Sequence, residues 1–216
     1  MKTQELNAAC QSTHGLMIAC ATLCVLLFSL ATPALIHAET PTTAVTSESI
    51  IFAVRQPGRG GHWYENFGYS AFDEEIKLYG SLGKLCRLDL ATNELTTLLD
   101  DPDGAVRDPQ VHYDGLKILF SYRPGGSDYF HLYEMGVDGR NLTQLTSGPF
   151  DDIEPTYLPD GGIVFCSSRC NRWVPCYVTQ VAVLYRCDGD GKNIRQLSPN
   201  TEQENTPWVL PDGRVL

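Results

Sequence analysis

The sequence is poor in positive charge. Its 216 residues include 16 Lys and Arg against 26 Asp and Glu, which gives a formal net charge of −10. Binding to a phosphate backbone requires clustered Lys and Arg, and the chain has no such cluster. We therefore expect neither a nucleic acid nor an anionic membrane surface as a partner, and no membrane contact beyond a leader segment.

The chain also lacks the short motifs of the common enzyme classes. It contains no Gly-x-Ser-x-Gly, phosphate-binding loop, dinucleotide fingerprint or His-Glu-x-x-His, and no Cys-x-x-Cys-His for haem attachment. Outside the first forty residues there is no amphipathic helix pattern of useful length. We expect no cofactor, no metal ion and no catalytic residue in this chain, although an enzyme without such a motif stays open.

The first forty residues have the layout of an export signal. No charge occurs from Leu16 to Ile36, and Ile36-His37-Ala38 precedes a segment rich in Thr and Ser. We expect residues 1–38 to be a signal peptide cleaved after Ala38, residues 39–47 to be a linker, and the protein to be periplasmic or secreted. The apolar run is also long enough for a retained anchor, which is the alternative.

Five cysteines follow the leader. An oxidising compartment favours disulfides, and an odd number leaves one thiol free or paired with a part of the protein that is not present. We predict a Cys170–Cys176 disulfide first and a cross-strand Cys166–Cys187 disulfide second, which leaves Cys86 as a buried strand thiol. A zinc site is the alternative, but the spacings lack a second close pair and an intervening His.

An internal repeat organises the rest of the chain. Leu142-Thr143-Gln144-Leu145 aligns with Ile194-Arg195-Gln196-Leu197 at an offset of 52 residues. The same offset aligns Asp138-Gly139 with Asp190-Gly191, Pro155 with Pro207, and Leu158-Pro159-Asp160-Gly161 with Leu210-Pro211-Asp212-Gly213. A shorter copy precedes them, with Asp108-Pro109 and Asp114-Gly115.

Each repeat unit predicts four short strands with Asp-Gly at tight hairpins. The strand patterns are clear at Ile50 to Arg55, Leu116 to Tyr122, Gly162 to Ser168 and Val181 to Cys187. Four strands per period of this length are typical of propeller blades, whereas a sandwich would not repeat in this way. We predict an all-β fold, a β-propeller of four-stranded blades over residues 48–216 with about three and a half blades present.

The repeat carries a family resemblance. The segment from Asp138 to Thr146, followed by Ile153 to Phe165, resembles the TolB-type propeller repeat, also described as WD40-like. More narrowly, Gly61 to Tyr69 together with Cys166 to Cys170 resembles the propeller-bearing proteins related to the hydrazine synthase alpha subunit. The resemblance implies architecture and an exported context. The multihaem chemistry of that family belongs to regions with Cys-x-x-Cys-His, which this chain lacks.

The fourth unit is incomplete in this sequence. It begins at Thr206 to Leu210 and ends at Leu216, inside a strand. Because a closed propeller has at least four full blades, we expect a partial propeller with unpaired edges that favour association. Missing C-terminal blades or domains are therefore expected partners, and in closed propellers the C-terminal part often supplies a strand to the first blade.

Three loops should share one face of the propeller, because the strands of a blade alternate in direction. The first, residues 56–83, offers His62 as a ligand or general base beside Trp63 and Tyr64, or else its aromatic residues pack as a plug. The second, Arg169 to Thr179, carries the cysteines.

The third is the acidic segment from Gly148 to Pro155, which contains Asp152. The family resemblance implies that an Asp here ties adjacent blades, and calcium binding is the alternative. Arg123 and Arg169, each just after a second strand, are expected either to pair with these acids or to face an anionic ligand.

These observations favour an exported binding or scaffold domain that docks a protein or small-molecule ligand on its loop face. The alternative is the N-terminal fragment of a haem-bearing, hydrazine synthase alpha-like redox enzyme, or of a hydrolase that contains a propeller.

Overall fold

A computed structural model describes residues 48–56, 69–70, 73–77, 80–175 and 179–216. These residues lie within a compact unit, Val45–Leu216. Their secondary structure is β apart from one 3₁₀ turn, Ser168–Cys170. No helix in the described ranges is long and apolar enough to span a membrane.

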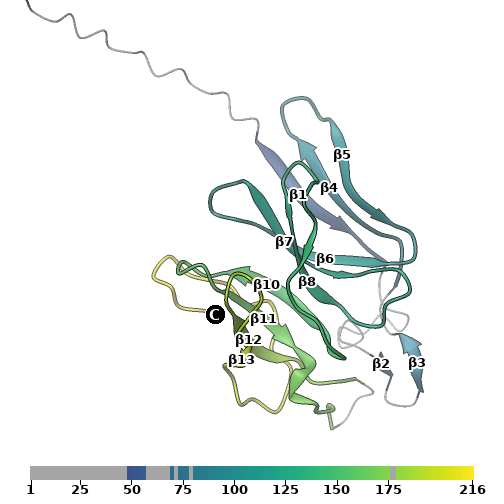
Figure 1. The fold of residues 1–216 in the computed structure, drawn as a ribbon, viewed down its shortest axis with the longest axis vertical. Helices are drawn as coiled ribbons and strands as arrows, with labels where there is room; N and C mark the ends of the chain where they lie inside the picture. Colours follow the sequence, from purple (N-terminus) through teal and green to yellow (C-terminus); the bar gives the residue numbers. More distant parts are fainter. Residues whose placement is uncertain (1–47, 57–68, 71–72, 78–79, 176–178) are drawn as a thin grey trace, which may run out of the picture. The chain divides into compact units, whose positions relative to one another are not determined.

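The strands form three successive antiparallel sheets and a short hairpin (Figure 1). The first sheet has the order β1-β4-β5, with β1 (Ser49–Val54), β4 (Gly83–Asp89) and β5 (Leu95–Asp101). The second contains β6 (Ala105–Val111), β7 (Lys117–Arg123), β8 (His131–Gly136) and β9 (Thr143–Gln144) in that order. The third contains β10 (Asp152–Tyr157), β11 (Ile163–Ser167), β12 (Val183–Cys187) and β13 (Arg195–Gln196). The hairpin is β2 (Tyr69–Ser70) with β3 (Asp73–Lys77).

The four strands predicted from the sequence are confirmed, and so are the Asp-Gly turns between them. In the turn that joins β10 to β11, the N–H of Gly161 donates to Leu158 O and that of Gly162 to Asp160 Oδ1. Gly161 has a φ of +84°, a conformation that glycine adopts without steric cost. The same turn recurs at Gly115 and Gly213, so each blade changes direction by the same local chemistry.

The strands β6 and β10, each the first of its sheet, contain a β-bulge beside a proline. The strand register shifts between Arg107 and Gln110 in β6, and between Ile153 and Thr156 in β10. The residue before the proline has a positive φ in three successive repeats: 54° at Asp108, 53° at Glu154 and 46° at Thr206. Bulges bend a strand and redirect its side chains, so this position recurs with the same geometry from blade to blade.

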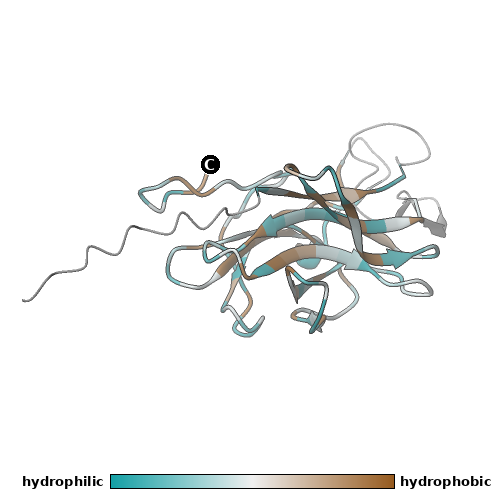
Figure 2. Ribbon diagram, turned by 90° about the horizontal axis from the view of Figure 1, so that it is seen from above, coloured by the Kyte–Doolittle hydropathy of each residue, from teal (hydrophilic) through white to brown (hydrophobic). Residues whose placement is uncertain are grey.

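The core is formed between neighbouring sheets. One cluster joins Leu85 of the first sheet to Val106, Ile118 and Phe120 of the second. Another joins Leu119 and Leu132 of the second sheet to Phe165, Val183 and other residues of the third. In Figure 2 the strands carry both hydrophobic and hydrophilic stretches, while several connecting hairpins are mainly hydrophilic. Each four-stranded sheet thus buries its faces against its neighbours, as propeller blades do.

Candidate functional site

The polar residues selected from the sequence divide into two groups. His62, Trp63 and Tyr64 lie outside the described residues, and their role in a ligand site stays a prediction. Arg123, Asp152 and Arg169 are described, and the structure shows their contacts.

Asp152 and Arg169 form a buried ion pair at the start of β10. Arg169 Nε donates to Asp152 Oδ1 at 3.0 Å and Nη2 donates to Oδ2 at 2.6 Å, while Ser167 Oγ donates to Oδ1 at 2.6 Å. Burial disfavours the charged carboxylate, but hydrogen bonds from His131, Arg169 and Ser167 outweigh it, so the pKa of Asp152 is lowered. Of the two expectations for Arg169, pairing with the acidic segment is what the structure shows.

Further contacts fix the Arg169 guanidinium within its own blade. Its Nη2 donates to Ser147 O at 2.8 Å, and its Cζ lies 5.0 Å from the centroid of the Phe150 ring. These contacts make Arg169 a tie between β11 and the connection that enters the blade.

Arg123 occupies the equivalent position in the second sheet but has different partners. Its Nη1 donates to Ser127 O and its Nη2 to Gly80 O, at 3.3 and 3.2 Å. It therefore links the connection after β7 to Gly80.

Carboxylates tie adjacent blades at this end of the strands, as the repeat predicts. Asp151 Oδ1 accepts from the N–H of Phe130 at 2.8 Å. At the preceding boundary Asp101 accepts from Tyr122 Oη at 2.6 Å and from the N–H of Gly125 at 2.8 Å.

The predicted Cys166–Cys187 disulfide is wrong. Both side chains are buried free thiols. Cys166 pairs with Leu184 and Cys187 with Ile163 across the β11–β12 ladder, and the two thiols belong to core clusters on opposite faces of the sheet. Because side chains alternate between faces along a strand, these sulfur atoms cannot meet.

The remaining cysteines of the propeller region are Cys170, Cys176 and Cys86. The predicted Cys170–Cys176 disulfide is wrong as well, because Cys170 is a free thiol whose Sγ donates to Val181 O at 3.3 Å. Cys176 itself lies outside the described residues. Cys86 is a buried free thiol on β4, as expected.

Sequence reasoning missed a buried charge at the bulges. Arg107 is 4% exposed, and its guanidinium donates to Asp108 Oδ2 and, at 2.9 Å, to Glu154 Oε1. The N–H of Glu154 donates to Asp108 Oδ2, and the N–H of Thr206 donates to Glu154 Oε2. We call Arg107, Asp108, Glu154 and Thr206 the bulge ladder. Desolvation of Glu154 outweighs the attraction of Arg107, so the pKa of Glu154 is raised.

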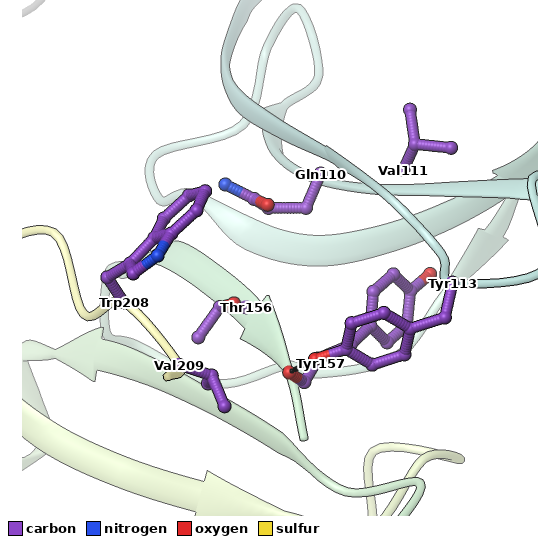
Figure 3. A pocket seen from close by; sticks show the side chains of 7 residues that line it. All are labelled: Gln110, Val111, Tyr113, Thr156, Tyr157, Trp208 and Val209. Carbon is purple, nitrogen blue, oxygen red and sulfur yellow. Dashed lines mark hydrogen bonds between the residues drawn. The ribbon is translucent and has the colours of Figure 1, made fainter. Parts of the chain in front are cut away.

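A cleft of about 80 Å³ lies just beyond the bulges (Figure 3). It is at the C-terminal end of β6 and β10, the first strands of their blades, which we call the inner strands. Three of its residues, Gln110, Thr156 and Trp208, directly follow the aligned prolines of successive repeats. The next residue of each repeat and Tyr113 complete the lining, which is Gln110, Val111, Tyr113, Thr156, Tyr157, Trp208 and Val209. The cleft is therefore built from the same positions of three blades. In the sequence, the residues that follow the aligned prolines could have identified this cleft.

The cleft combines aromatic walls with neutral polar groups. In Figure 3 the amide of Gln110 extends toward the indole of Trp208, and the ring of Tyr113 lies beside Tyr157. Trp208 is 56% exposed, whereas Tyr157 is buried. No Asp, Glu, Lys, Arg or His is among the lining residues of this described cleft. It is suited to a neutral group with one apolar face.

Tyr157 is the fixed wall of the cleft. Its Oη donates to Glu134 Oε1 at 2.9 Å, and Tyr113 Oη donates to its backbone O at 2.8 Å. His112 packs against its ring in a T-shaped arrangement and Lys117 Nζ lies 5.5 Å from the ring centroid. Burial and the bond to Glu134 raise the pKa of Tyr157, so its hydroxyl stays protonated.

Comparison with known proteins shows likeness at the level of structure. No family model and no curated protein matches the sequence. Hydrazine synthase from Kuenenia stuttgartiensis aligns with a TM-score of 0.60 and 20% identity, over 78% of this chain and 27% of its own. The fold is a partial β-propeller.

Two further propeller structures align less closely. TolB from Acinetobacter baumannii has a TM-score of 0.47 and 18% identity, over 61% of this chain and 30% of its own. Puromycin hydrolase has a TM-score of 0.48 and 16% identity, over 74% of this chain and 24% of its own. The hydrazine synthase alignment confirms the predicted propeller resemblance for the fold. The chain spans 27%, 30% and 24% of the lengths of the hydrazine synthase, TolB and puromycin hydrolase chains.

Proposed function

We propose that this partial propeller is a non-catalytic binding domain of an exported protein, and that its ligand contacts the cleft beside Trp208. The observation that carries the proposal is the origin of the cleft, since three equivalent positions of three successive blades line it. Propellers repeat their blades around an axis, so residues at equivalent inner-strand positions converge on one ligand.

The chemistry of the cleft supports binding rather than catalysis. Its polar side-chain groups are an amide, a hydroxyl, two phenols and the indole N–H of Trp208. Burial and the bond to Glu134 raise the pKa of the Tyr157 phenol, which opposes proton transfer near neutral pH. Within the described ranges, no three His, Cys, Asp or Glu side chains are arranged to hold a metal ion. An exposed Trp beside neutral hydrogen-bonding groups is typical of recognition of a ring or an apolar side chain.

The test is a binding screen of the purified protein against immobilised neutral glycans and a hexapeptide library. Trp208→Ala and Thr156→Val should weaken any specific hit by at least about tenfold, as central aromatic contacts commonly do. Trp173→Ala is the matched control, because Trp173 is also exposed but lies outside the cleft. A hit that tolerates Trp208→Ala would place the ligand elsewhere, and His62→Ala would then test the loop-face alternative with Trp63, Tyr64, Arg123, Asp152 and Arg169.

A second candidate function rests on the structural match to hydrazine synthase. In that case the propeller is the scaffold of a redox enzyme whose haem groups are held by regions outside this chain. The test is covalent haem in the full-length protein, measured by the pyridine haemochrome spectrum. Haem would favour the redox scaffold, and its absence together with a cleft ligand would favour the binding domain.

Export is part of the proposal and has its own test. The mature protein should begin at Glu39, which N-terminal sequencing of the protein from a periplasmic or culture fraction would show. A protein that keeps residues 1–38 and is found in a membrane fraction would instead support an anchor.

A further inference from the structure

The side chains around the cleft leave hydrogen-bonding capacity open to a ligand. Gln110 and Thr156 form no side-chain hydrogen bond with any described residue, and neither does the indole N–H of Trp208. An amide, a hydroxyl and an indole together supply both donors and acceptors. A ligand that fills the cleft should therefore offer both kinds of partner, because a polar group that is buried without a partner is costly.

Aromatic rings bound the same space. In Figure 3 Trp208 lies on one side of the cleft, and Tyr113 and Tyr157 lie on the opposite side. Trp208 is 56% exposed and Tyr113 is 66% exposed, so both rings are accessible to a ligand. The ligand should thus have an apolar face in addition to its polar edges.

Hydrogen bonds hold the two exposed rings in place. The N–H of Leu216 donates to Trp208 O at 2.9 Å, and the N–H of Trp208 donates to Leu216 O at 3.3 Å. Tyr113 is fixed through its Oη, which donates to Tyr157 O at 2.8 Å. Rings that are already ordered lose little conformational freedom on binding, so they form a prepared platform.

The cleft opens into a longer groove of about 510 Å³. The lining of this groove is Tyr113, Pro159, Trp208, Val209, Leu210 and Pro211. Tyr113, Pro159 and Pro211 are equivalent residues of three repeats, because each directly precedes an Asp-Gly turn. The volume lies within the range of about 300–1,000 Å³ that is usual for small-molecule sites. The cleft and the groove together therefore have room for more than one ring.

The site is electrically neutral. No Asp, Glu, Lys, Arg or His lines either the cleft or the groove in the part of the chain that the structure describes. At two of the hairpins beside the groove the acidic residue has its own cation. Asp160 Oδ2 accepts from Arg186 Nη2 at 2.6 Å, and Asp212 Oδ2 accepts from Arg214 Nε at 2.8 Å. A charged ligand would enter without a counter-charge, which disfavours it.

We propose that the cleft and the groove bind a neutral oligosaccharide. The inference rests on the proposed binding function and names its class of ligand. A pyranose ring has an apolar C–H face, which stacks on Trp208, and hydroxyl groups at its edge, which exchange hydrogen bonds with Gln110 and Thr156. A second ring continues along the groove beside Tyr113. An apolar peptide side chain would contact the rings but would leave the amide and the hydroxyl unpaired.

The experiment titrates the purified protein with maltohexaose, cellohexaose, mannohexaose and chitohexaose by isothermal titration calorimetry. Hexagalacturonate is the charged probe and hexaproline the peptide probe. We expect a neutral hexasaccharide to bind at least about threefold more tightly than its monosaccharide, because the second ring adds an aromatic contact.

Protein variants locate the saccharide in the cleft. Trp208→Ala should weaken its binding by at least about tenfold, and Gln110→Met should weaken it by about three- to tenfold, the usual effect of one lost hydrogen bond. Trp173→Ala and Gln144→Met are the matched controls and should leave binding unchanged, because both residues are exposed and lie outside the cleft and the groove.

The outcomes separate this inference from the proposed function. A peptide that binds in a Trp208-dependent way, without binding of any neutral saccharide, would overturn the saccharide class and leave the cleft as the binding site. Preference for hexagalacturonate, absence of binding by all four neutral probes, or undiminished binding to Gln110→Met would also overturn the saccharide class. A saccharide that tolerates Trp208→Ala would overturn the inference and the proposed site together.

Discussion

The backbone N–H of Glu154 donates a 3.2 Å hydrogen bond to Oδ2 of Asp108, and so joins the bulges of two successive inner strands. Arg107 lies between the same two carboxylates. A buried cation or carboxylate is costly when it has no partner. Here the charge of Arg107 and those of the two carboxylates offset one another. The bulge ladder is a polar contact inside an otherwise apolar boundary between blades.

Replacing Arg107 by Met should destabilise the protein by about 3–5 kcal/mol, because two carboxylates would lose their buried counter-charge. The measurement is urea unfolding followed by Trp fluorescence at neutral pH. Arg140→Met is the control, since Arg140 is highly exposed and an exposed pair contributes at most about 1 kcal/mol. Equal losses in the two variants would show that the ladder is energetically neutral.

Asp152 should make the protein sensitive to acid. Its pKa in the folded protein is below the ordinary value of 3.8, so its stabilisation is fully present above that value and is lost as the pH falls through the folded pKa. Asp152→Asn should lower the urea midpoint at pH 7 and reduce the further loss on acidification to about pH 2. An unchanged difference between the two pH values would contradict the assignment.

Glu154 should act in the opposite direction. Its folded pKa is above the ordinary value of 4.5, so its contribution is present below 4.5 and is lost as the pH rises through the raised pKa. Glu154→Gln should therefore flatten the decline in stability above that pH while leaving the acid limb governed by Asp152. The check is the urea midpoint of both proteins at half-unit pH steps from 4 to 8.

The buried thiols should be unreactive until the protein unfolds. Burial raises the pKa of Cys187 to about 12 and raises that of Cys166 well above its ordinary value, which suppresses the thiolate that reacts with alkylating agents. Iodoacetamide without reductant should leave both unlabelled in the native protein and label both in urea. A peptide pair linked through Cys166 and Cys187 in the mass spectrum would refute the free-thiol assignment.

Replacing Gly83 by a larger residue should destabilise the protein through a clash with β6 rather than through strain in the Gly83 backbone. A Cβ at Gly83 would lie 2.5 Å from Val106 N and 2.7 Å from Ala105 Cα, so Gly83→Ala must push β4 away from β6. We expect a loss of about 1–3 kcal/mol, the usual range for overpacking. Gly115→Ala meets no atom within 4 Å and has a φ of +72°, so it should cost about 1 kcal/mol from backbone strain alone. Thermal unfolding of the two variants compares these mechanisms.

The repeat made most of the fold predictable. Asp160-Gly161 fixes a hairpin through local bonds within four residues, and such chemistry is visible in a sequence. The continuous apolar runs in β7 and β11 likewise indicated strands that are buried on both faces. The family resemblance likewise implied that an Asp of the acidic segment ties adjacent blades, and Asp151 makes that contact with the N–H of Phe130.

The site was less predictable because its contacts join distant residues. Arg107 and Glu154 are 47 residues apart, and nothing near either residue distinguishes a buried pair from two surface charges. Cys166 and Cys187 lie on adjacent strands, which predicts a cross-strand pair, but their side chains point to opposite faces of the sheet. Because side chains alternate between faces along a strand, counting residues along β11 and β12 would have excluded the disulfide.

The spacing between the bulges has a consequence for protein engineering. Asp108 and Glu154 are 46 residues apart, whereas Glu154 and Thr206 are 52 apart, yet the same hydrogen bond joins each pair. The longer repeat accommodates its extra residues in the connection between β11 and β12, while Glu154 and Thr206 keep their phase. Within that connection Pro175 is exposed whereas Val174 is buried in the core. A foreign loop or affinity epitope should therefore be grafted next to Pro175, where Val174 and the inner strands keep their packing.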